Sequence, residues 1–448
     1  MNKEISIEMV SNLRATFLAD KQACQRMNSV TGHGIDAASF SYTAPVNTPN
    51  TFSVELKTGD ITAQKASGRC WLFAATNIMR LEVMKKCELK TFELSQAYLF
   101  FWDKFEKANY FLESILDTLD EEVGGRLINW FLRGPFADGG QWDMVAALVA
   151  KYGVVPKSAM PESFSSSASA RMNKFLTLKV REFARELRNA HEYGTSMNKL
   201  RVRKEEMLRI IFKMLCICLG TPPERFDFEE RGKEKNDQPG RYTRDLNITP
   251  QGFYDTYVGK KLDDYVSLIN APTSDKPFYT IYTVAYLGNV IGGAPVRYLN
   301  LPVENLKRAA LAQLESGEPV WFGSDVGQML DMEHGLLSLD AFDVENLFGT
   351  PFPLDKAARL EYSESLMNHA MVFQGVNVID GKPNRWKVEN SWGDERGEKG
   401  WFRMSDDWFN EYVYQIVVNK RFLTNEERAC LDKTPITLKP WDPMGSLA

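Results

Sequence analysis

The sequence of residues 64–73 is Gln-Lys-Ala-Ser-Gly-Arg-Cys-Trp-Leu-Phe, and we place the chemistry in this stretch. Small residues fill most of the gap between Gln64 and Cys70, and an apolar stripe with helical spacing follows the cysteine as far as Met84. The pattern predicts a loop that leads into a helix whose first residue is Cys70. Free backbone N–H groups and the helix dipole at that end favour thiolate over thiol.

Gln64 completes a candidate site for acyl transfer. Its side chain can fold back over the loop and place an amide N–H beside the backbone N–H of Cys70, and two such donors form an oxyanion hole. The alternative is that Cys70 is a structural residue at the start of a core helix, as most buried cysteines are. A nucleophilic cysteine also needs a base, and the base needs a third group that fixes its tautomer.

Both further groups occur near the other end of the chain. His369 precedes an apolar run broken by glycine, which predicts a base at the mouth of a buried strand. Asn390 ends a short strand, and Trp392 follows two residues later. Asn390 can accept a hydrogen bond from one ring nitrogen of His369 while the other nitrogen faces Cys70. Trp392 can keep water away from that bond.

These residues resemble the papain-like cysteine peptidases, whose cysteine motif precedes a His and an Asn far downstream. The resemblance implies catalytic roles for Gln64, Cys70, His369 and Asn390, which occur in the family's order. Residues 390–393, Asn-Ser-Trp-Gly, match the family's asparagine motif, which also implies a place for Trp392 at the substrate.

A further segment strengthens the resemblance. Residues 138–142, Asp-Gly-Gly-Gln-Trp, are similar to the substrate wall of that family, which implies that Gly139 and Gly140 bind the substrate. Within the family, residues 64–71 and 441–445 resemble the bleomycin hydrolase and bacterial aminopeptidase C group, and the likeness covers nearly the whole chain.

Three positions depart from the pattern of the secreted papain-like members. Ser67 stands where those members carry a disulfide cysteine, Arg69 replaces a small residue, and Asn368 replaces an Asp. Ser67 fits a reducing compartment. The other two change the groups around the thiolate and leave the pH range of activity open.

Composition and net charge argue against several classes of protein, namely nucleic-acid-binding, membrane-spanning and disulfide-rich secreted proteins. The chain has 448 residues, 44% hydrophobic, and its net charge of −5 gives no general attraction to nucleic acid or anionic lipid. The N-terminus lacks an apolar signal core, and the most apolar helical stretch, 210–219, is too short to cross a bilayer. Six cysteines in this length do not make a disulfide framework. We therefore expect a soluble cytoplasmic protein.

No cofactor or metal is expected. Cys216 and Cys218 are one residue apart, but no nearby His or further Cys completes a metal site, and an apolar helix face explains them better. An acidic excursion at 330–352 contains His334, but its spacing matches no cation-binding loop.

The spacing of the site indicates where the chain is enlarged. Cys70 and His369 are 299 residues apart, whereas the resembling family has about 130–150, so roughly 150 residues are inserted between the two halves. We expect an α+β, papain-like two-lobed core. The expected divisions are 1–55 for an N-terminal helix and oligomerisation hook, 56–165 for the helical half with Cys70, 166–275 for a helical insert, 276–435 for the β-rich half, and 436–448 for a C-terminal arm.

The periodicity predicts the elements within these divisions. One helix should end near Met27 and an extended arm without periodicity should follow at 28–50. Residues 171–213 form a charged helical stretch with twelve Lys/Arg against five Asp/Glu. Such a stretch can bind nucleic acid, but sparse aromatic residues and an acidic chain favour a solvated helix pair. Strands are expected at 278–284, 296–301, 319–326, 400–404 and 414–419, and a helix at 303–317.

We expect a cysteine aminopeptidase that acts on peptides with a free N-terminus. The resemblance implies a homohexamer held by the hook, and an arm that enters the cleft so that the Ala448 carboxylate pairs with the substrate's α-amino group. Prolines and Trp441 fit an extended, anchored arm, and the alternative for the arm is a disordered terminus. The alternative functions are a thiol acyltransferase and a scaffold or nucleic-acid-binding protein that retains the fold.

Overall fold

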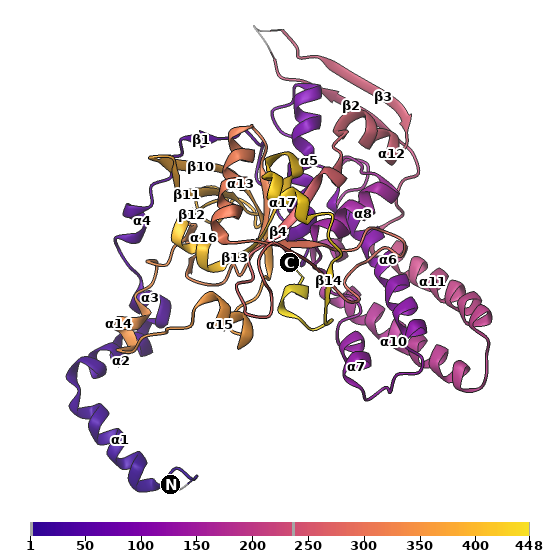
Figure 1. Cartoon of the computed structure of the whole chain (residues 1–448). Helices are drawn as coiled ribbons and strands as arrows, with labels where there is room; N and C mark the ends of the chain where they lie inside the picture. Colours follow the sequence, from indigo (N-terminus) through magenta and orange to yellow (C-terminus); the bar gives the residue numbers. More distant parts are fainter. Residues whose placement is uncertain (1–2, 235–237, 448) are drawn as a thin grey trace.

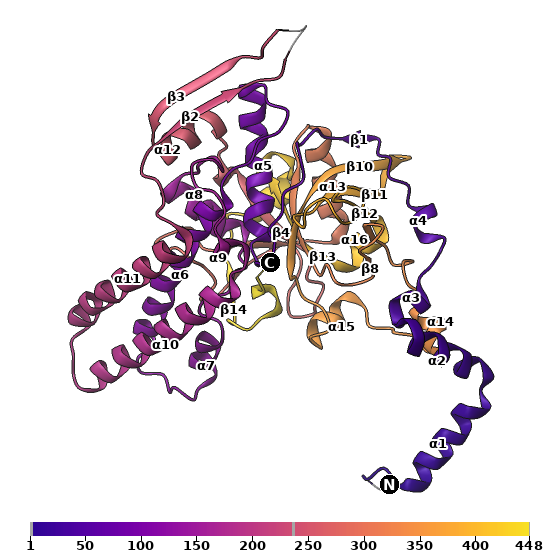
Figure 2. The ribbon, with the colours of Figure 1, turned by 180° about the vertical axis from the view of Figure 1, so that it is seen from behind.

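Two groups of elements meet at the helix that begins with Cys70. The computed structural model describes residues 3–234 and 238–447 (Figure 1). Helices α5 to α11 gather on one side, and the orange and yellow strands with α13, α16 and α17 gather on the other (Figures 1 and 2). Helix α5 contacts α6 and α8 of the first group and strand β10 of the second. The expected mixture of a helical half and a strand-rich half is confirmed.

The helical half is built around α5, Cys70–Cys87, which is apolar on nearly every side. Trp71, Leu72, Ala75 and Met79 are all fully buried, as expected for a helix without a polar face. The half also contains α6 Gln96–Asp117, α7 Arg126–Arg133, α8 Trp142–Tyr152 and α9 Phe164–Ser167. The predicted helix start at Cys70 is confirmed.

The strand-rich half contains one large sheet. Among the described residues its strands lie in the order β14-β5-β6-β4-β13-β7-β10-β11-β12-β9-β8, and β1 pairs with β10. The bounds are β1 Val54–Glu55, β4 Tyr265–Ile269, β5 Thr280–Val284, β6 Tyr298–Asn300, β7 Val320–Ser324, β8 Leu330–Asp331, β9 Leu336–Leu337, β10 His369–Ile379, β11 Lys382–Glu389, β12 Trp401–Ser405, β13 Val413–Asn419 and β14 Ile436–Leu438. The predicted strands are confirmed to within a few residues.

Strand β10 is buried over its first eight residues, because α5 contacts it and α13 packs against the sheet as well. A strand covered on both faces has a continuous apolar sequence, which explains the run after His369. The helices of this half are α13 Val303–Glu315, α14 Val344–Phe348, α15 Lys356–Glu361, α16 Asp406–Tyr412 and α17 Asn425–Cys430.

The N-terminal segment differs from the prediction. Instead of one helix and an unpatterned arm, it contains α1 Ile7–Ala19, α2 Lys21–His33, α3 Ile35–Ser39 and α4 Ala44–Asn47. The break falls at Asp20, whose carboxylate accepts hydrogen bonds from the backbone N–H groups of Gln22 and Ala23 and so caps a second helix. Helix α1 projects away from the body (Figure 1).

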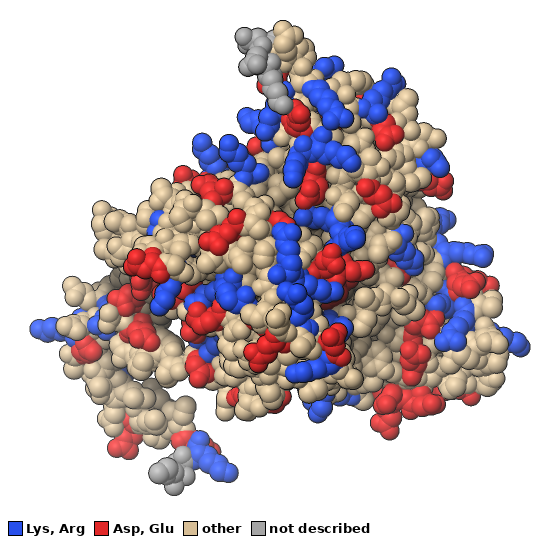
Figure 3. Space-filling view, turned by 45° about the horizontal axis from the view of Figure 1, so that its top comes forward, with Lys and Arg blue, Asp and Glu red and all other residues tan. Residues whose placement is uncertain are grey.

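The inserted region is partly as expected. The helix pair is α10 Ala170–Glu192 and α11 Met197–Leu219. On the face of the protein shown in Figure 3, positively and negatively charged side chains are interspersed. The pair is not wholly solvated, because Leu176, Phe183 and Leu187 are buried and both helices contact α6.

The stretch expected to be irregular contains a hairpin, β2 Phe226–Arg231 with β3 Tyr242–Ile248, and then α12 Pro250–Phe253 and a π-helical turn at Tyr254–Val258. Strand β4 follows and pairs antiparallel with β13. The central sheet therefore begins before the expected boundary at 275.

Candidate active site

Cys70 lies at the junction of the two halves. It is the first residue of α5 and its side chain is buried. Its Sγ accepts a hydrogen bond from the backbone N–H of Ala370 at 3.4 Å, one residue after His369 in β10. The nucleophile predicted from the helical half and the base predicted from the strand-rich half are thus brought together.

His369 is oriented by two neighbours on the strand side. Its Nε2 donates a hydrogen bond to Oδ1 of Asn390 at 2.9 Å. The ring of Trp392 stacks on the imidazole with the ring centres 4.7 Å apart. Because Nε2 carries the proton in this bond, Nδ1 of the neutral ring is left as the basic nitrogen. Asn390 therefore selects the tautomer in which Nδ1 is free to accept a proton.

Gln64 is held by a residue that the sequence argument did not single out. Its Oε1 accepts a hydrogen bond from Oγ of Ser391 at 2.6 Å, and its Nε2 donates to the carbonyl of Ser67 at 2.6 Å. The bond to Ser391 fixes which way the amide points and leaves its second hydrogen available beside the Cys70 helix. The signal for Ser391 was its place within the Asn-Ser-Trp-Gly motif.

Arg69 explains one departure from the family pattern. Its guanidinium is fully buried and forms two hydrogen bonds with Glu162, at 3.0 and 2.8 Å. Arg69 also donates to Oγ of Ser67 at 2.9 Å and to the carbonyl of Gln64. One buried ion pair thus ties down the loop that carries Gln64. Glu162 was not predicted from the sequence, although a buried charge needs a partner.

Asp138 joins the substrate-wall segment to the same loop. Its carboxylate accepts from the backbone N–H of Gly68 at 3.1 Å and pairs with Lys104 at 2.6 Å. The positive charge of Lys104 lies close enough to outweigh burial, so the pKa of Asp138 is held well below its usual value. The backbone carbonyl of Asp138 accepts from the indole of Trp71.

Gly139 and Gly140, which are predicted to bind the substrate, follow Asp138 directly. A Cβ added to Gly140 would lie 2.6 Å from the ring of Trp71, so only glycine fits there. The carbonyl of Gly139 accepts a hydrogen bond from Nζ of Lys107 at 2.7 Å.

Comparison with known proteins agrees with this geometry. The model of the peptidase C1-like family matches residues 4–445. This chain belongs to the peptidase C1-like family.

Similar proteins match over most or all of the chain. An aminopeptidase C from Streptococcus thermophilus is 48% identical, with 99% of each chain covered. A human bleomycin hydrolase is 44% identical, with 87% of this chain and 86% of the relative covered. The crystal structure of PepW from Lactobacillus rhamnosis matches with a TM-score of 0.97 at 47% identity and covers both chains completely. The papain-like fold of this peptidase C1-like chain follows from these matches.

Burial shifts the pKa values of both Cys70 and His369. It raises the pKa of the Cys70 thiol to about 11, although hydrogen bonds from Ala370 and from the start of α5 oppose the shift. Burial also lowers the pKa of His369 to about 4. The expected preference for thiolate is therefore outweighed by desolvation, and the resting pair is a neutral thiol beside a neutral imidazole.

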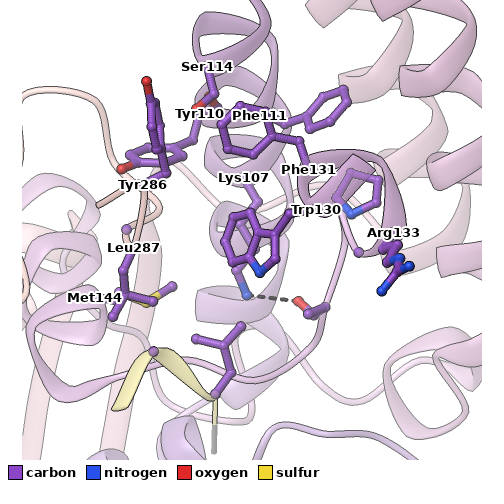
Figure 4. Close-up of a pocket in the computed structure, with 16 residues that line it drawn as sticks. Lys107, Tyr110, Phe111, Ser114, Trp130, Phe131, Arg133, Met144, Tyr286 and Leu287 are labelled. Atoms are coloured by element: carbon purple, nitrogen blue, oxygen red, sulfur yellow. Dashed lines mark hydrogen bonds between the residues drawn. The ribbon is translucent and has the colours of Figure 1, made fainter. Parts of the chain in front are cut away.

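An apolar cavity of about 500 Å³ lies beside the substrate wall (Figure 4). Aromatic side chains from three segments of the chain line it. They are those of Tyr110, Phe111, Trp130 and Tyr286. The C-terminal arm borders the same cavity through Gly445 and Leu447. Its lining is completed by Lys107, Ser114, Phe131, Arg133, Gly134, Pro135, Ala137, Met144, Leu287 and Gly288.

The C-terminal arm contacts the body of the protein at three places. Nε2 of Gln141 donates to the carbonyl of Ser446 at 2.6 Å, and Asp442 pairs with Lys276 at 3.1 Å. Trp441 packs under the guanidinium of Arg126 at 4.0 Å. Ala448, which the sequence predicted to meet the substrate, lies outside the described residues.

Within residues 3–234 and 238–447, no group of His, Cys, Asp and Glu side chains is arranged to hold a metal ion. His334 instead bonds to Asp331 at 2.6 Å. The six cysteines are free thiols. No helix in the described part of the chain is long and apolar enough to span a membrane.

Proposed function

We propose that this chain is a cysteine aminopeptidase that removes N-terminal residues from peptides and related amides. The observation that carries the proposal is the convergence of Cys70, His369, Asn390 and Gln64 at one junction, with the C-terminal arm running to the substrate wall beside them. Relatives of nearly the same length are named aminopeptidase C and bleomycin hydrolase.

The reaction begins with proton transfer from Cys70 to Nδ1 of His369. Transfer of one proton from Cys70 to His369 creates the thiolate and the imidazolium together, so the net charge of the buried pair stays zero. The thiolate attacks the peptide carbonyl, and the oxyanion accepts hydrogen bonds from the free amide hydrogen of Gln64 and the backbone N–H of Cys70. His369 returns the proton to the leaving amine, and water hydrolyses the thioester. This chemistry requires no cofactor.

The arm makes the enzyme an aminopeptidase. The contacts of Trp441, Asp442 and Ser446 support an ordered path towards the Cys70 site. We propose that the Ala448 carboxylate pairs with the α-ammonium of the peptide and blocks longer chains on that side. The first peptide bond then lies at Cys70.

Removal of residues 445–448 tests the role of the arm. The truncated enzyme should cut N-acetylated peptides at internal bonds and lose its preference for a free N-terminus. Identical products from truncated and full-length enzyme would contradict this role. Cys70→Ser provides the matched control, since it should remove both activities while keeping the fold.

An acyltransferase would use the same thioester with an amine acceptor. Incubation of the enzyme with a peptide and excess amine separates the two functions, because hydrolysis yields the free acid and transfer yields the new amide. A scaffold that merely retains the fold would yield neither product.

We further propose that residues 1–55 hold a closed homohexamer. In α1, Ile7, Leu13 and Leu18 are more than half exposed, which a monomer has little reason to keep. Closed symmetry among identical subunits would cover this apolar surface. A cytoplasmic location stays a prediction, which the free thiols support. The division of the chain into a helical insert and a C-terminal arm also stays a prediction.

A further inference from the structure

Asp325 and Asn368 meet where the strand that carries His369 begins. Asp325 follows Ser324, the last residue of β7, and Asn368 precedes His369, the first residue of β10. His369 is paired with Ser324 in the antiparallel ladder. One backbone hydrogen bond continues past this pair, from the N–H of Asn368 to the carbonyl of Ser324 at 3.0 Å. The position of the base therefore depends on what holds Asn368.

The side chain of Asn368 is held at both ends of its amide. Its Nδ2 donates to Oδ1 of Asp325 at 2.5 Å, and its Oδ1 accepts from the backbone N–H of Val326 at 3.1 Å. These bonds fix the orientation of the amide, because a reversed amide would place its oxygen against the carboxylate. Together with the backbone bond, they attach the residue before His369 to the end of β7.

The carboxylate of Asp325 is the centre of a buried network. Asp325 is only 5% exposed, and Ser365 and Tyr414 are buried beside it. Its Oδ2 accepts from the hydroxyl of Ser365 at 2.8 Å and from Nε2 of Gln328 at 3.1 Å. The hydroxyl of Tyr414 donates in turn to Ser365 at 2.8 Å. With Asn368, three side-chain donors share the two oxygens of one carboxylate, whereas a neutral amide would offer them a single acceptor oxygen.

The network restrains the segments on either side of the base. Ser365 lies in the segment that leads into β10, and Tyr414 lies in β13, which pairs with β7. The start of β10 therefore cannot shift along β7 without breaking several hydrogen bonds to a buried charge. This restraint matters for the reaction, because a displacement of about 1 Å at a reacting group can slow catalysis about 100-fold.

The same contact explains why residue 368 is Asn in this chain. An Asp at that position would place its carboxylate directly against the carboxylate of Asp325. Two carboxylates so close cannot both remain charged without repulsion. One of the two positions must therefore carry an amide when the other carries the carboxylate.

We propose that Asp325 is a positioning residue for His369 and acts through Asn368. Its carboxylate holds the Asn368 amide, which fixes the start of β10 and keeps the imidazole aligned with Asn390 and Cys70. This inference rests on the proposed role of His369 as the base. The contribution falls on the chemical step, so it changes kcat and not KM.

The test exchanges the two side chains. Asp325→Asn leaves three donors with one acceptor oxygen, and Asn368→Asp brings two carboxylates together. In mildly alkaline buffer each single variant should lower kcat roughly 10- to 100-fold with little change in KM. In the double variant Asp325→Asn/Asn368→Asp, the amide at 325 donates to the carboxylate at 368, and its oxygen remains for Ser365 and Gln328. The double variant should therefore recover kcat to within roughly threefold of the wild type.

Alkylation of Cys70 by iodoacetamide gives a second readout that needs no substrate. Because His369 accepts the thiol proton as the sulfur reacts, the alkylation rate should fall and recover together with kcat. A purely structural role of Asp325 would lower the melting temperature but would leave both rates of the folded enzyme unchanged.

Two further variants complete the set. Asn368 is exposed, so Asn368→Ala leaves the buried donors of Asp325 in place and tests the proposal even where Asp325→Asn does not fold. It should lower kcat roughly 3- to 10-fold. Asp380→Asn, which lies directly after the far end of β10, is the matched control and should leave kcat unchanged.

Wild-type kcat and alkylation rates in the single variants, or a double variant no more active than Asp325→Asn, would overturn the inference. His369→Ala is measured in parallel. If His369→Ala keeps the wild-type kcat, the proposed function fails and this inference fails with it. If His369→Ala abolishes activity while the variants of Asp325 and Asn368 keep it, His369 remains the base and Asp325 does not position it.

Discussion

Replacing Arg80 by methionine should destabilise the protein strongly and displace Asn390. Arg80 lies in α5, and Glu389 is the last residue of β11, directly before Asn390. Nη2 of Arg80 and Oε1 of Glu389 are 2.8 Å apart, and both side chains are almost completely buried. Gln374 donates to the other oxygen of Glu389. The ion pair therefore joins the helix that begins with Cys70 to the strand that precedes Asn390.

The magnitude follows from the burial. Removal of one partner from a buried ion pair leaves an uncompensated charge and costs about 3–5 kcal/mol. Burial already raises the pKa of Glu389, and loss of the Arg80 charge would raise it further. The carboxyl of the variant then takes up a proton as the pH falls, which removes the buried charge. The loss of stability should therefore be larger at pH 8 than at pH 5.

Urea unfolding of the wild type, Arg80→Met and the double variant Arg80→Met/Glu389→Gln at both pH values measures these effects. The double variant removes both charges and should recover most of the stability, because a buried pair replaced by neutral groups of similar size is often nearly neutral. The kcat/KM of the single variant should fall as well. A loss below about 1 kcal/mol in the single variant at pH 8, or no recovery in the double variant, would refute the reasoning.

Further predictions concern the catalytic pair and the assembly. The pH profile of kcat/KM should have an acid limb near pH 4, because below it His369 is already protonated and cannot accept the proton of Cys70; a limb near 6.5 would contradict the effect of burial. Brief treatment with iodoacetamide should modify Cys70, as peptide mapping can establish, and abolish activity, because His369 can accept the thiol proton as the sulfur reacts. Activity after complete modification of Cys70 would exclude the mechanism. Light scattering should give a particle several times larger than the 51.0 kDa chain; a monomer mass would contradict the hexamer.

The sequence predicted those parts of the site that have a local signature. Cys70 precedes a helical apolar stripe, His369 begins a continuous apolar run, and Asn390 ends a strand, and each of these contexts arises from residues a few positions away. The structure then brings the three together. The central strands were predictable for the same reason, because a strand that is buried on both faces has a nearly continuous run of apolar residues.

The parts that were missed depend on distant partners. Glu162 binds Arg69 across 93 residues, and Ser391 binds Gln64 across 327. No periodicity records such pairs, since each is created only when the tertiary fold is complete. The N-terminal error has a local cause instead. Asp20 caps a second helix, whereas the apolar periodicity on both sides of it predicts one continuous helix.

The substitution of Ser67 for a disulfide cysteine shows how the loop before Cys70 is held without a covalent bond. The buried pair of Arg69 with Glu162 holds one side of the loop, and the bond from Gly68 to Asp138 holds the other side against the substrate wall. Each carboxylate is also bonded to other groups, Glu162 to Ser166 and Asp138 to Lys104 and Asn173. A buried charge that loses one partner is left uncompensated at a cost of several kcal/mol. Displacing the loop would break several of these bonds together, so the network restrains the backbone around Cys70 as a crosslink would. Unlike a disulfide, it does not depend on the redox state of the surroundings.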